Sequence, residues 1–190
     1  MYGLFLDKKC NATGACSKCQ ANCCKSYLIA LTSFDLRRIY KKTNSLDFFT
    51  TINADNFDTC LAQSFILFEK DAPKEYFLVL SRKKNGSCIF LGKDNLCAIY
   101  NERPIVCRIY PFRYRNEKIL YKDKIKCPAE WEITPKIKEE FLKAHKMQLE
   151  ELKSFGARCR EWNANHSKTG NLELFLKFIL QQPKNKKTNI

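Results

Sequence analysis

Apolar residues at three- and four-residue steps predict two helices in the last third of the chain. Thr134 can cap the first helix, and proline suits the next position because it lacks an N–H there. The apolar stripe of this helix, which we expect to end at Gly156, consists of Ile137, Phe141, Leu142, His145, Leu149 and Leu152. The second helix spans about 172–180 and ends before Pro183. Both patterns are typical of helices that pack on a core, and His145 lies within such a stripe.

Shorter patterns occupy the rest of the chain. Thr32 and Asp35 resemble a capping box at the start of a helix over 32–43. The apolar run 26–31 predicts a strand, and 45–61 predicts a weakly patterned helix. Segments 75–81 and 87–91 flank Asn85-Gly86, a dipeptide that favours a tight hairpin, and a further turn is expected at 92–95. The sequence therefore predicts an α+β fold with a small antiparallel sheet or hairpins, several helices and a mainly helical C-terminus.

Length and composition narrow the class of protein. The chain has 190 residues with 34 Lys+Arg against 20 Asp+Glu, a net charge of +14. Its apolar runs fall far short of the roughly 20 residues that cross a bilayer, and no secretory signal is recognisable. We expect a cytoplasmic protein with one domain over residues 1–182 and a basic tail over 183–190.

Eleven cysteines need an explanation in such a protein. Their odd number and the reducing cytosol argue against a disulfide scaffold and favour metal binding. Four of them lie within nine residues, as Cys16-x2-Cys19-x3-Cys23-Cys24. Thiolates packed this closely repel one another unless a cation binds them. The adjacent pair suggests a multinuclear cluster or two neighbouring sites.

A second, wider set consists of Cys88, Cys97, Cys107 and Cys127. The two sets together supply eight candidate ligands, the number that two four-thiolate sites require. We expect Cys60 and Cys159 to pack in the core, and Cys10 to be a weaker candidate ligand. The fold is then organised around a cysteine-ligated metal site.

Four sequence elements make this chain resemble a known family. They are C-S-K-C-Q-A-N-C-C from Cys16, C-I-F-L from Cys88, C-A-I-Y from Cys97 and Y-N-E-R-P-I-V-C-R-I-Y-P-F from Tyr100. The chain is similar over about 15–128 to the CxxCxxCC, or YkgJ-type, cysteine-cluster family, which is described as zinc- or iron-chelating. Related sequence occurs in flagellin lysine N-methylases, which the resemblance implies carry an iron–sulfur cluster. It implies the same eight cysteines as ligands, although three residues, rather than two, separate Cys19 from Cys23.

The choice of metal stays open between an iron–sulfur cluster and zinc, because thiolates suit both. The two histidines, His145 and His166, are far from the cysteine motifs, which disfavours a mixed Cys/His zinc site. Short spacings, the adjacent pair and Cys127-Pro128 favour [4Fe–4S] at one or two sites. Arg103 and Arg108 flank Cys107, and we expect them to donate hydrogen bonds to thiolate sulfurs.

Three classes of function compete. The leading one is a metal-cluster protein with a structural, redox or maturation role and a protein partner. A zinc-stabilised nucleic-acid binder is the first alternative, because 108–126 holds seven basic and two acidic residues with interleaved aromatics. We favour a solvated strand pair there, since lysines run through the whole chain. A cluster-assisted enzyme, resembling a methyl transferase, is the second alternative, but the sequence supplies no catalytic residue and no glycine-rich nucleotide loop.

Overall fold

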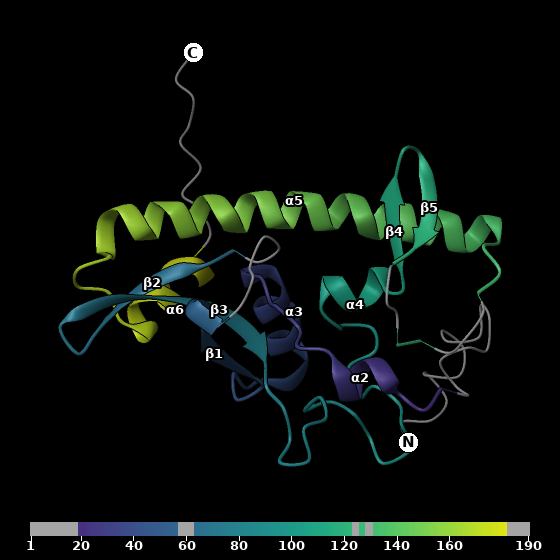
Figure 1. Cartoon of the computed structure of the whole chain (residues 1–190), viewed down its shortest axis with the longest axis horizontal. Helices are drawn as coiled ribbons and strands as arrows, with labels where there is room; N and C mark the ends of the chain where they lie inside the picture. Colours follow the sequence, from purple (N-terminus) through teal and green to yellow (C-terminus); the bar gives the residue numbers. More distant parts are fainter. Residues whose placement is uncertain (1–18, 57–62, 123–125, 128–130, 182–190) are drawn as a thin grey trace.

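One long helix, α5 (Pro135–His166), runs along most of the molecule; two groups of elements pack on it, and the two-stranded hairpin over 112–121 crosses it (Figure 1). The computed structural model describes residues 19–56, 63–122, 126–127 and 131–181. The other elements, in chain order, are α2 (Asn22–Ser26), α3 (Ser33–Thr43), β1 (Phe49–Asn53), the 3-10 helix η1 (Ala54–Asn56), β2 (Phe65–Glu69), β3 (Ala72–Leu80), α4 (Ile105–Ile109), β4 (Phe112–Arg115), β5 (Lys118–Tyr121) and α6 (Leu172–Leu180). These helices and small antiparallel sheets confirm the α+β class.

The first group is a three-stranded antiparallel sheet with the order β1-β3-β2, which packs with α3, α6 and the C-terminal half of α5. Phe49 pairs with Leu80 across β1 and β3, and Phe65 pairs with Tyr76 across β2 and β3. The Phe65 and Phe175 rings stack at 3.8 Å, and Trp162 packs edge-on against Phe175. Large buried rings of this kind supply most of the apolar area that a small core removes from water.

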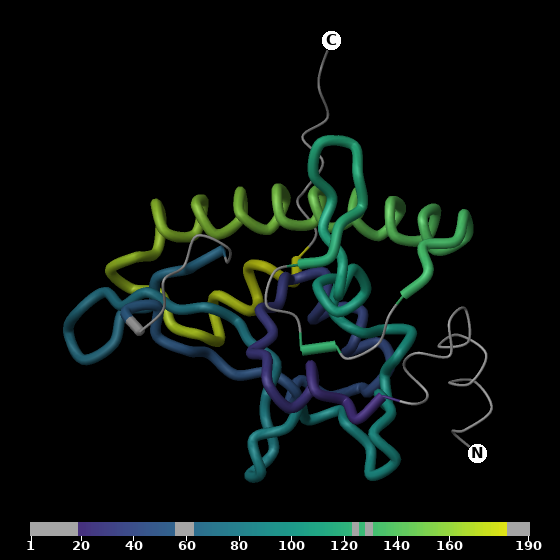
Figure 2. Tube along the Cα trace, turned by 45° about the vertical axis from the view of Figure 1, so that its right-hand side comes forward, coloured from purple at the N-terminus to yellow at the C-terminus, as the bar shows by residue number. Residues whose placement is uncertain are grey.

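The second group comprises α2, the segment that joins β3 to α4, α4 itself and the β4–β5 hairpin. A small cluster of Ile109, Phe112, Ile137 and Phe141 packs α4 and the hairpin on the N-terminal half of α5. His145 stacks on Phe141 and contacts Tyr114, so it is a packed residue as its position in the apolar stripe predicts. In Figures 1 and 2 alike, α2 lies against the segment between β3 and α4.

Several predicted elements agree with the structure. Helix α3 begins after Thr32 with the capping box that the sequence indicates, and α6 has the predicted bounds. Thr134 caps α5, but this helix continues ten residues beyond Gly156, to His166. Gly156 is buried, and a Cβ there would come within 2.5 Å of the Gln63 side chain. The glycine therefore allows a close side-chain approach within the helix and does not end it.

Other predicted elements were wrong. The described part of 45–61 is not a helix but β1 and η1, because the Thr50-Thr51-Ile52 run suits a pleated strand and pairs with β3. Segment 26–31 is not a strand; it makes one isolated bridge, between Ala30 and Val79. Asn85-Gly86 does lie in a turn, but only Gly86 has a positive φ, and 87–91 forms no strand.

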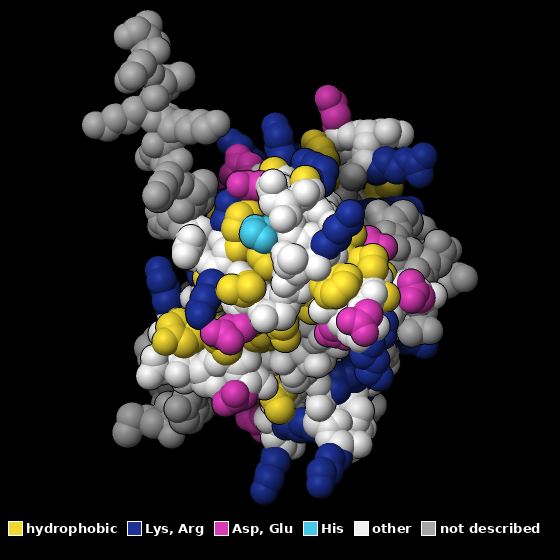
Figure 3. Space-filling view, turned by 90° about the vertical axis from the view of Figure 1, so that its left-hand side faces the viewer, with side chains coloured by type: hydrophobic (Ala, Val, Ile, Leu, Met, Phe, Trp, Pro, Cys, Tyr) yellow, Lys and Arg dark blue, Asp and Glu magenta, His cyan; other side chains and the backbone are white. Residues whose placement is uncertain are grey.

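Charged side chains are spread over the surface. On the face shown in Figure 3, Lys and Arg side chains are scattered around the perimeter with acidic side chains between them. In the β4–β5 hairpin Phe112 is buried, while Tyr114 and Tyr121 are 38% and 36% exposed. The predicted strand pair is therefore present, with only part of its aromatic surface in the core. In the described ranges no helix is both long and apolar enough to span a membrane.

Candidate metal centre

Helix α2 carries Cys23 and Cys24, and hydrogen bonds hold it against the segment between β3 and α4. The Cys88 N–H donates to the Cys24 carbonyl at 2.8 Å. The Arg82 guanidinium donates to the Tyr27 carbonyl at 2.6 Å and to the Lys25 carbonyl at 2.7 Å. Three backbone carbonyls at the end of α2 are therefore satisfied by one short segment, which brings the adjacent cysteine pair to Cys88.

Cys88 and Cys97 open two successive turns of the same kind. The Leu91 N–H donates to the Cys88 carbonyl at 3.0 Å, and the Tyr100 N–H donates to the Cys97 carbonyl at 3.2 Å. A bridge between Leu91 and Cys97 pairs the two turns. The matching C-I-F-L and C-A-I-Y elements thus have matching local structures, and they place both cysteines beside α2 and α4.

Cys107 lies in α4, whose start is held by a buried carboxylate. The Ile105 N–H donates to Asp35 Oδ1 at 2.9 Å, although the two residues are 70 positions apart. Asp35 also accepts from the Thr32 N–H at 2.9 Å, so one side chain caps α3 and fixes the start of α4. The first N–H groups of a helix have no partner within the helix, and a carboxylate satisfies them well.

Asp35 belongs to a buried network that reaches α5. Arg38 forms ion pairs with both Asp35 and Glu151, and its Nη2 donates to Glu151 Oε2 at 2.9 Å. Asp35 and Glu151 are 0% and 5% exposed. Loss of one member would leave a buried charge without its partner, which is far more costly than loss of an exposed pair. The network therefore fixes α4, and Cys107 with it, against α3 and α5.

The thiols of these three segments lie within electrostatic reach of one another. Burial raises the pKa of Cys107, and the charges of Cys97, Cys88 and Cys23 raise it further. Burial likewise raises the pKa of Cys97 to about 11, with a contribution from Cys88. The Cys23 and Cys24 sulfurs are 3.9 Å apart and share a hydrogen bond that lowers the pKa of Cys23 and raises that of Cys24. A cation among these sulfurs would stabilise their thiolate forms together.

Two tyrosine hydroxyls accept hydrogen bonds from the backbone of Lys126 and Cys127. The hydroxyl of Tyr110 accepts from the Cys127 N–H at 2.9 Å and from the Lys126 N–H at 2.8 Å. The hydroxyl of Tyr27 also accepts from Lys126, at 3.0 Å, and the two tyrosine rings meet edge to face. The Trp131 indole N–H donates to the Cys127 sulfur at 3.5 Å. Since Tyr27 follows α2 and Tyr110 follows α4, this pair ties Cys127 to both cysteine-bearing helices.

The two arginines beside Cys107 bind backbone oxygens, and their predicted hydrogen bonds to metal-bound thiolates stay a prediction. Arg103 donates to the carbonyls of Tyr100 and Cys107, and Arg108 donates to those of Arg103 and Asn101. These bonds tie the 100–108 segment together and are made to carbonyl oxygens, not to sulfur. The positive charge of Arg103 still lowers the pKa of Cys97 and Cys107 to a small extent, against the larger effect of burial.

Five of the eight candidate ligands, Cys23, Cys24, Cys88, Cys97 and Cys107, thus lie on neighbouring segments at one end of the molecule. Cys19 accepts a hydrogen bond from the Ala21 N–H at 3.3 Å, and Cys16, Cys10 and Cys60 lie outside the described residues. Cys159 is 2% exposed in the core, as predicted. Among the described residues no three His, Cys, Asp or Glu side chains have a geometry that would hold a metal ion. The eight-ligand set therefore stays a prediction.

The described cysteines other than Cys159 are partly exposed free thiols, a soft donor set that fits zinc or an iron–sulfur cluster.

Sequence reasoning missed the residues that position the thiols. Asp35 was identified only as a cap, and no local pattern connects it with Arg38, Glu151 or Ile105. Tyr110 lies three residues after Cys107 in the R-P-I-V-C-R-I-Y-P element, and this fixed step was the one available signal for its role.

The free thiols gathered at one end of the α+β fold are the donor set of cysteine-ligated metal-binding proteins. The chain matches the family model CxxCxxCC, described as "Putative zinc- or iron-chelating domain", over residues 15–160, and it belongs to that family. The match extends beyond the 15–128 span of the motifs and includes most of α5, the helix that contributes Glu151 to the network. No curated protein and no solved structure matches the chain. Membership of the family supports metal binding and leaves zinc and iron as the two choices.

Proposed function

We propose that the chain is an iron–sulfur protein that holds a [4Fe–4S] cluster at its thiol-rich end, in a structural, redox or maturation role. The observation that carries the proposal is the convergence of five thiols from α2, the two turns and α4. A zinc ion and a [4Fe–4S] cluster each take four thiolates, so the number of thiols does not separate them; the short spacings, the adjacent Cys23–Cys24 pair and Cys127-Pro128 favour iron–sulfur. The predicted ligands, enough for two such four-thiolate sites, are Cys16, Cys19, Cys23, Cys24, Cys88, Cys97, Cys107 and Cys127.

The chain's own residues would set the properties of such a centre. When bound, a [4Fe–4S] cluster supplies one-electron transfer at a potential that depends on hydrogen bonds and solvent exposure. Here Trp131 donates to the Cys127 sulfur, and the Ala21 N–H donates to the Cys19 sulfur. The cysteines are partly exposed, so water reaches the site, which is compatible with exchange of electrons or of a cluster with a partner protein.

Anaerobic purification followed by metal and sulfide analysis tests the proposal. We expect iron with an equal amount of acid-labile sulfide, and a broad visible absorption that bleaches on reduction. Stoichiometric zinc in a colourless sample without sulfide would refute the iron–sulfur assignment.

A matched pair of variants tests the location. Cys107→Ala removes a thiol of the cluster, whereas Cys159→Ala removes one that is buried in the core. We expect the first to lose most of its iron and sulfide and the second to retain both, with urea denaturation used to confirm that each is folded. Full iron content in Cys107→Ala would show that the cluster does not use this site.

A further inference from the structure

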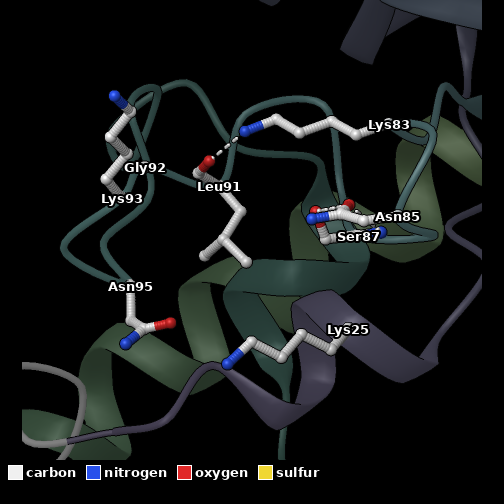
Figure 4. Close-up of a pocket in the computed structure, with 8 residues that line it drawn as sticks. All are labelled: Lys25, Lys83, Asn85, Ser87, Leu91, Gly92, Lys93 and Asn95. Carbon is white, nitrogen blue, oxygen red and sulfur yellow. Dashed lines mark hydrogen bonds between the residues drawn. The ribbon is translucent and has the colours of Figure 1, made fainter.

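A cavity of about 350 Å³ lies beside the thiol-rich end (Figure 4). It is bounded by α2 and by two turns after β3, at residues 83–86 and 92–95. Its lining residues are Lys25, Lys83, Asn85, Ser87, Leu91, Gly92, Lys93 and Asn95. Lys25 reaches the cavity from α2, while Lys93 and Asn95 lie on the turn at 92–95. The volume lies within the range of small-molecule sites, at its lower end.

The charge of this cavity is positive and is not neutralised by its own walls. Three lysines line it, and no carboxylate does. Asp94, on the same turn, is not a lining residue and accepts from the Leu96 N–H at 3.1 Å. The three lysines are exposed, so the attraction of an anion comes from their combined charge and their donors in one concave site.

Two of the lysines are held in place by uncharged oxygens. Lys25 Nζ donates to the Gln20 carbonyl at 2.6 Å, and Lys83 Nζ donates to the Leu91 carbonyl. An ammonium group has three donors, so one bond to a carbonyl orients the group and leaves its charge and its other donors for a ligand. These bonds already order the two long side chains, so the binding of a ligand costs less conformational entropy.

The neutral lining residues indicate the kind of ligand. Asn85 Oδ1 accepts from the Ser87 N–H at 3.1 Å and from its hydroxyl at 2.8 Å, so the amide nitrogen of Asn85 remains as a donor. Leu91 is the one large apolar side chain of the lining, and no aromatic ring is present on which a base could stack. The lining offers donors and positive charge, and little for an apolar or aromatic group.

We infer that this cavity binds a small polyvalent anion that bears phosphate or carboxylate groups. Lys25 and Lys83 would form charge-assisted hydrogen bonds with it, and Lys93 would add charge at the rim. Lys25 directly follows Cys24 and Ser87 directly precedes Cys88, so the anion would be bound next to the thiol centre. The inference does not depend on which metal that centre holds.

Calorimetric titration of the full chain at physiological salt, with pyrophosphate in one arm and citrate in the other, tests the inference. The pocket variant is the double substitution Lys25→Gln and Lys83→Gln. The control, Lys42→Gln with Lys138→Gln, makes the same charge change on exposed residues of α3 and α5. We expect saturable binding of at least one anion, weakened by about tenfold or more in the pocket variant and by less than about twofold in the control.

The tighter arm identifies the ligand class as phosphate or carboxylate. Equal weakening in the two double variants would mean that net charge alone attracts the anion and would overturn the inference, as would the absence of saturable binding of both anions. The single variant Lys93→Gln, expected to show a smaller loss, covers the case in which the pocket variant is poorly folded. Metal content measured on the same samples keeps this outcome separate from that of the iron–sulfur proposal.

Discussion

The two ends of the molecule are held together by different forces. At the sheet end, Trp162, Phe65 and Phe175 are at most 1% exposed and pack between regular strands and helices. At the thiol end, residues 81–104 contain no helix or strand; backbone hydrogen bonds and Arg82 hold them, Ile99 is buried in the main core, and Ile89 and Phe90 pack on its edge. The comparison indicates that apolar burial dominates at the sheet end and polar backbone contacts at the thiol end, where we expect a bound metal to add further order.

Helix α5 is the element that the two ends share. Its C-terminal half contributes Phe155 and Trp162 to the main core, and its N-terminal half contributes Ile137 and Phe141 to the small cluster under α4. Glu151 lies between these two regions and binds Arg38. We therefore expect the ends to be energetically coupled, with most of the coupling passing through α5 and the buried network.

Removal of the metal should produce the largest difference between the two ends in protection of their amides from hydrogen exchange. After treatment with a strong chelator under reducing, oxygen-free conditions, we expect amides of α2, 81–104 and 126–127 to lose most of their protection from hydrogen exchange. Amides of β1, β3 and α6 should keep theirs, because none of the described candidate ligands is among the buried residues of their core and only Cys88 and Cys97 of these ligands pack at its edge. Mass spectrometry of peptic fragments measures both. Uniform loss across the chain would show that the two ends do not fold separately.

Truncation of a core side chain should lower the free energy of unfolding and leave metal binding by the folded protein unchanged. Trp162→Ala removes a side chain that is 1% exposed and breaks its hydrogen bond to the Ile66 carbonyl, which should cost about 3–5 kcal/mol of the free energy of unfolding. Leu149→Ala, on the same helix but 55% exposed, should cost no more than about 0.5 kcal/mol. Urea denaturation gives both values. Metal bound per folded molecule should stay unchanged in each variant.

Loss of the Asp35 charge should weaken both the cap of α3 and the attachment of α4. Asp35→Asn keeps the side-chain size but removes the negative charge that Arg38 and the Ile105 N–H contact, and we expect a cost of about 1–3 kcal/mol. Because α4 carries Cys107, metal should also pass to a competing chelator several times faster than in the wild type. Glu139→Gln, on the exposed face of α5, provides the matched control. A release rate equal to that of the control would contradict a role of Asp35 in positioning Cys107.

The smallest expected effect is that of Tyr110→Phe. This variant removes the acceptor of the Cys127 N–H, while Lys126 keeps its bond to Tyr27, so the loss should be about 0.5–1.5 kcal/mol. Faster hydrogen exchange at 126–127 with an intact sheet end is the expected signature. Tyr40→Phe, at an exposed position of α3, should leave exchange at 126–127 unchanged.

Local patterns predicted the starts of α3, α5 and α6 well because capping signals are local, although α5 continues past its predicted end at Gly156. The Thr32–Asp35 box, the Thr134-Pro135 start and the stripe of α6 each lie within one or two helical turns. The prediction failed at β1, whose Thr-Thr-Ile run becomes a strand only through its pairing with β3. The supports of the candidate site depend on pairs far apart in the chain, such as Asp35 with Ile105 and Arg38 with Glu151. No spacing within a short window encodes such contacts.

The irregular course of residues 81–104 has a consequence for the lifetime of the protein. The segment includes Arg82, Lys83, Lys84 and Lys93, after each of which a trypsin-like protease can cut once the backbone becomes accessible. Such cleavage follows the population of the open form, and metal that binds only the closed form lowers that population. We expect chains that have acquired metal to outlast those that have not, so that proteolytic turnover matches the amount of this protein to the supply of its metal.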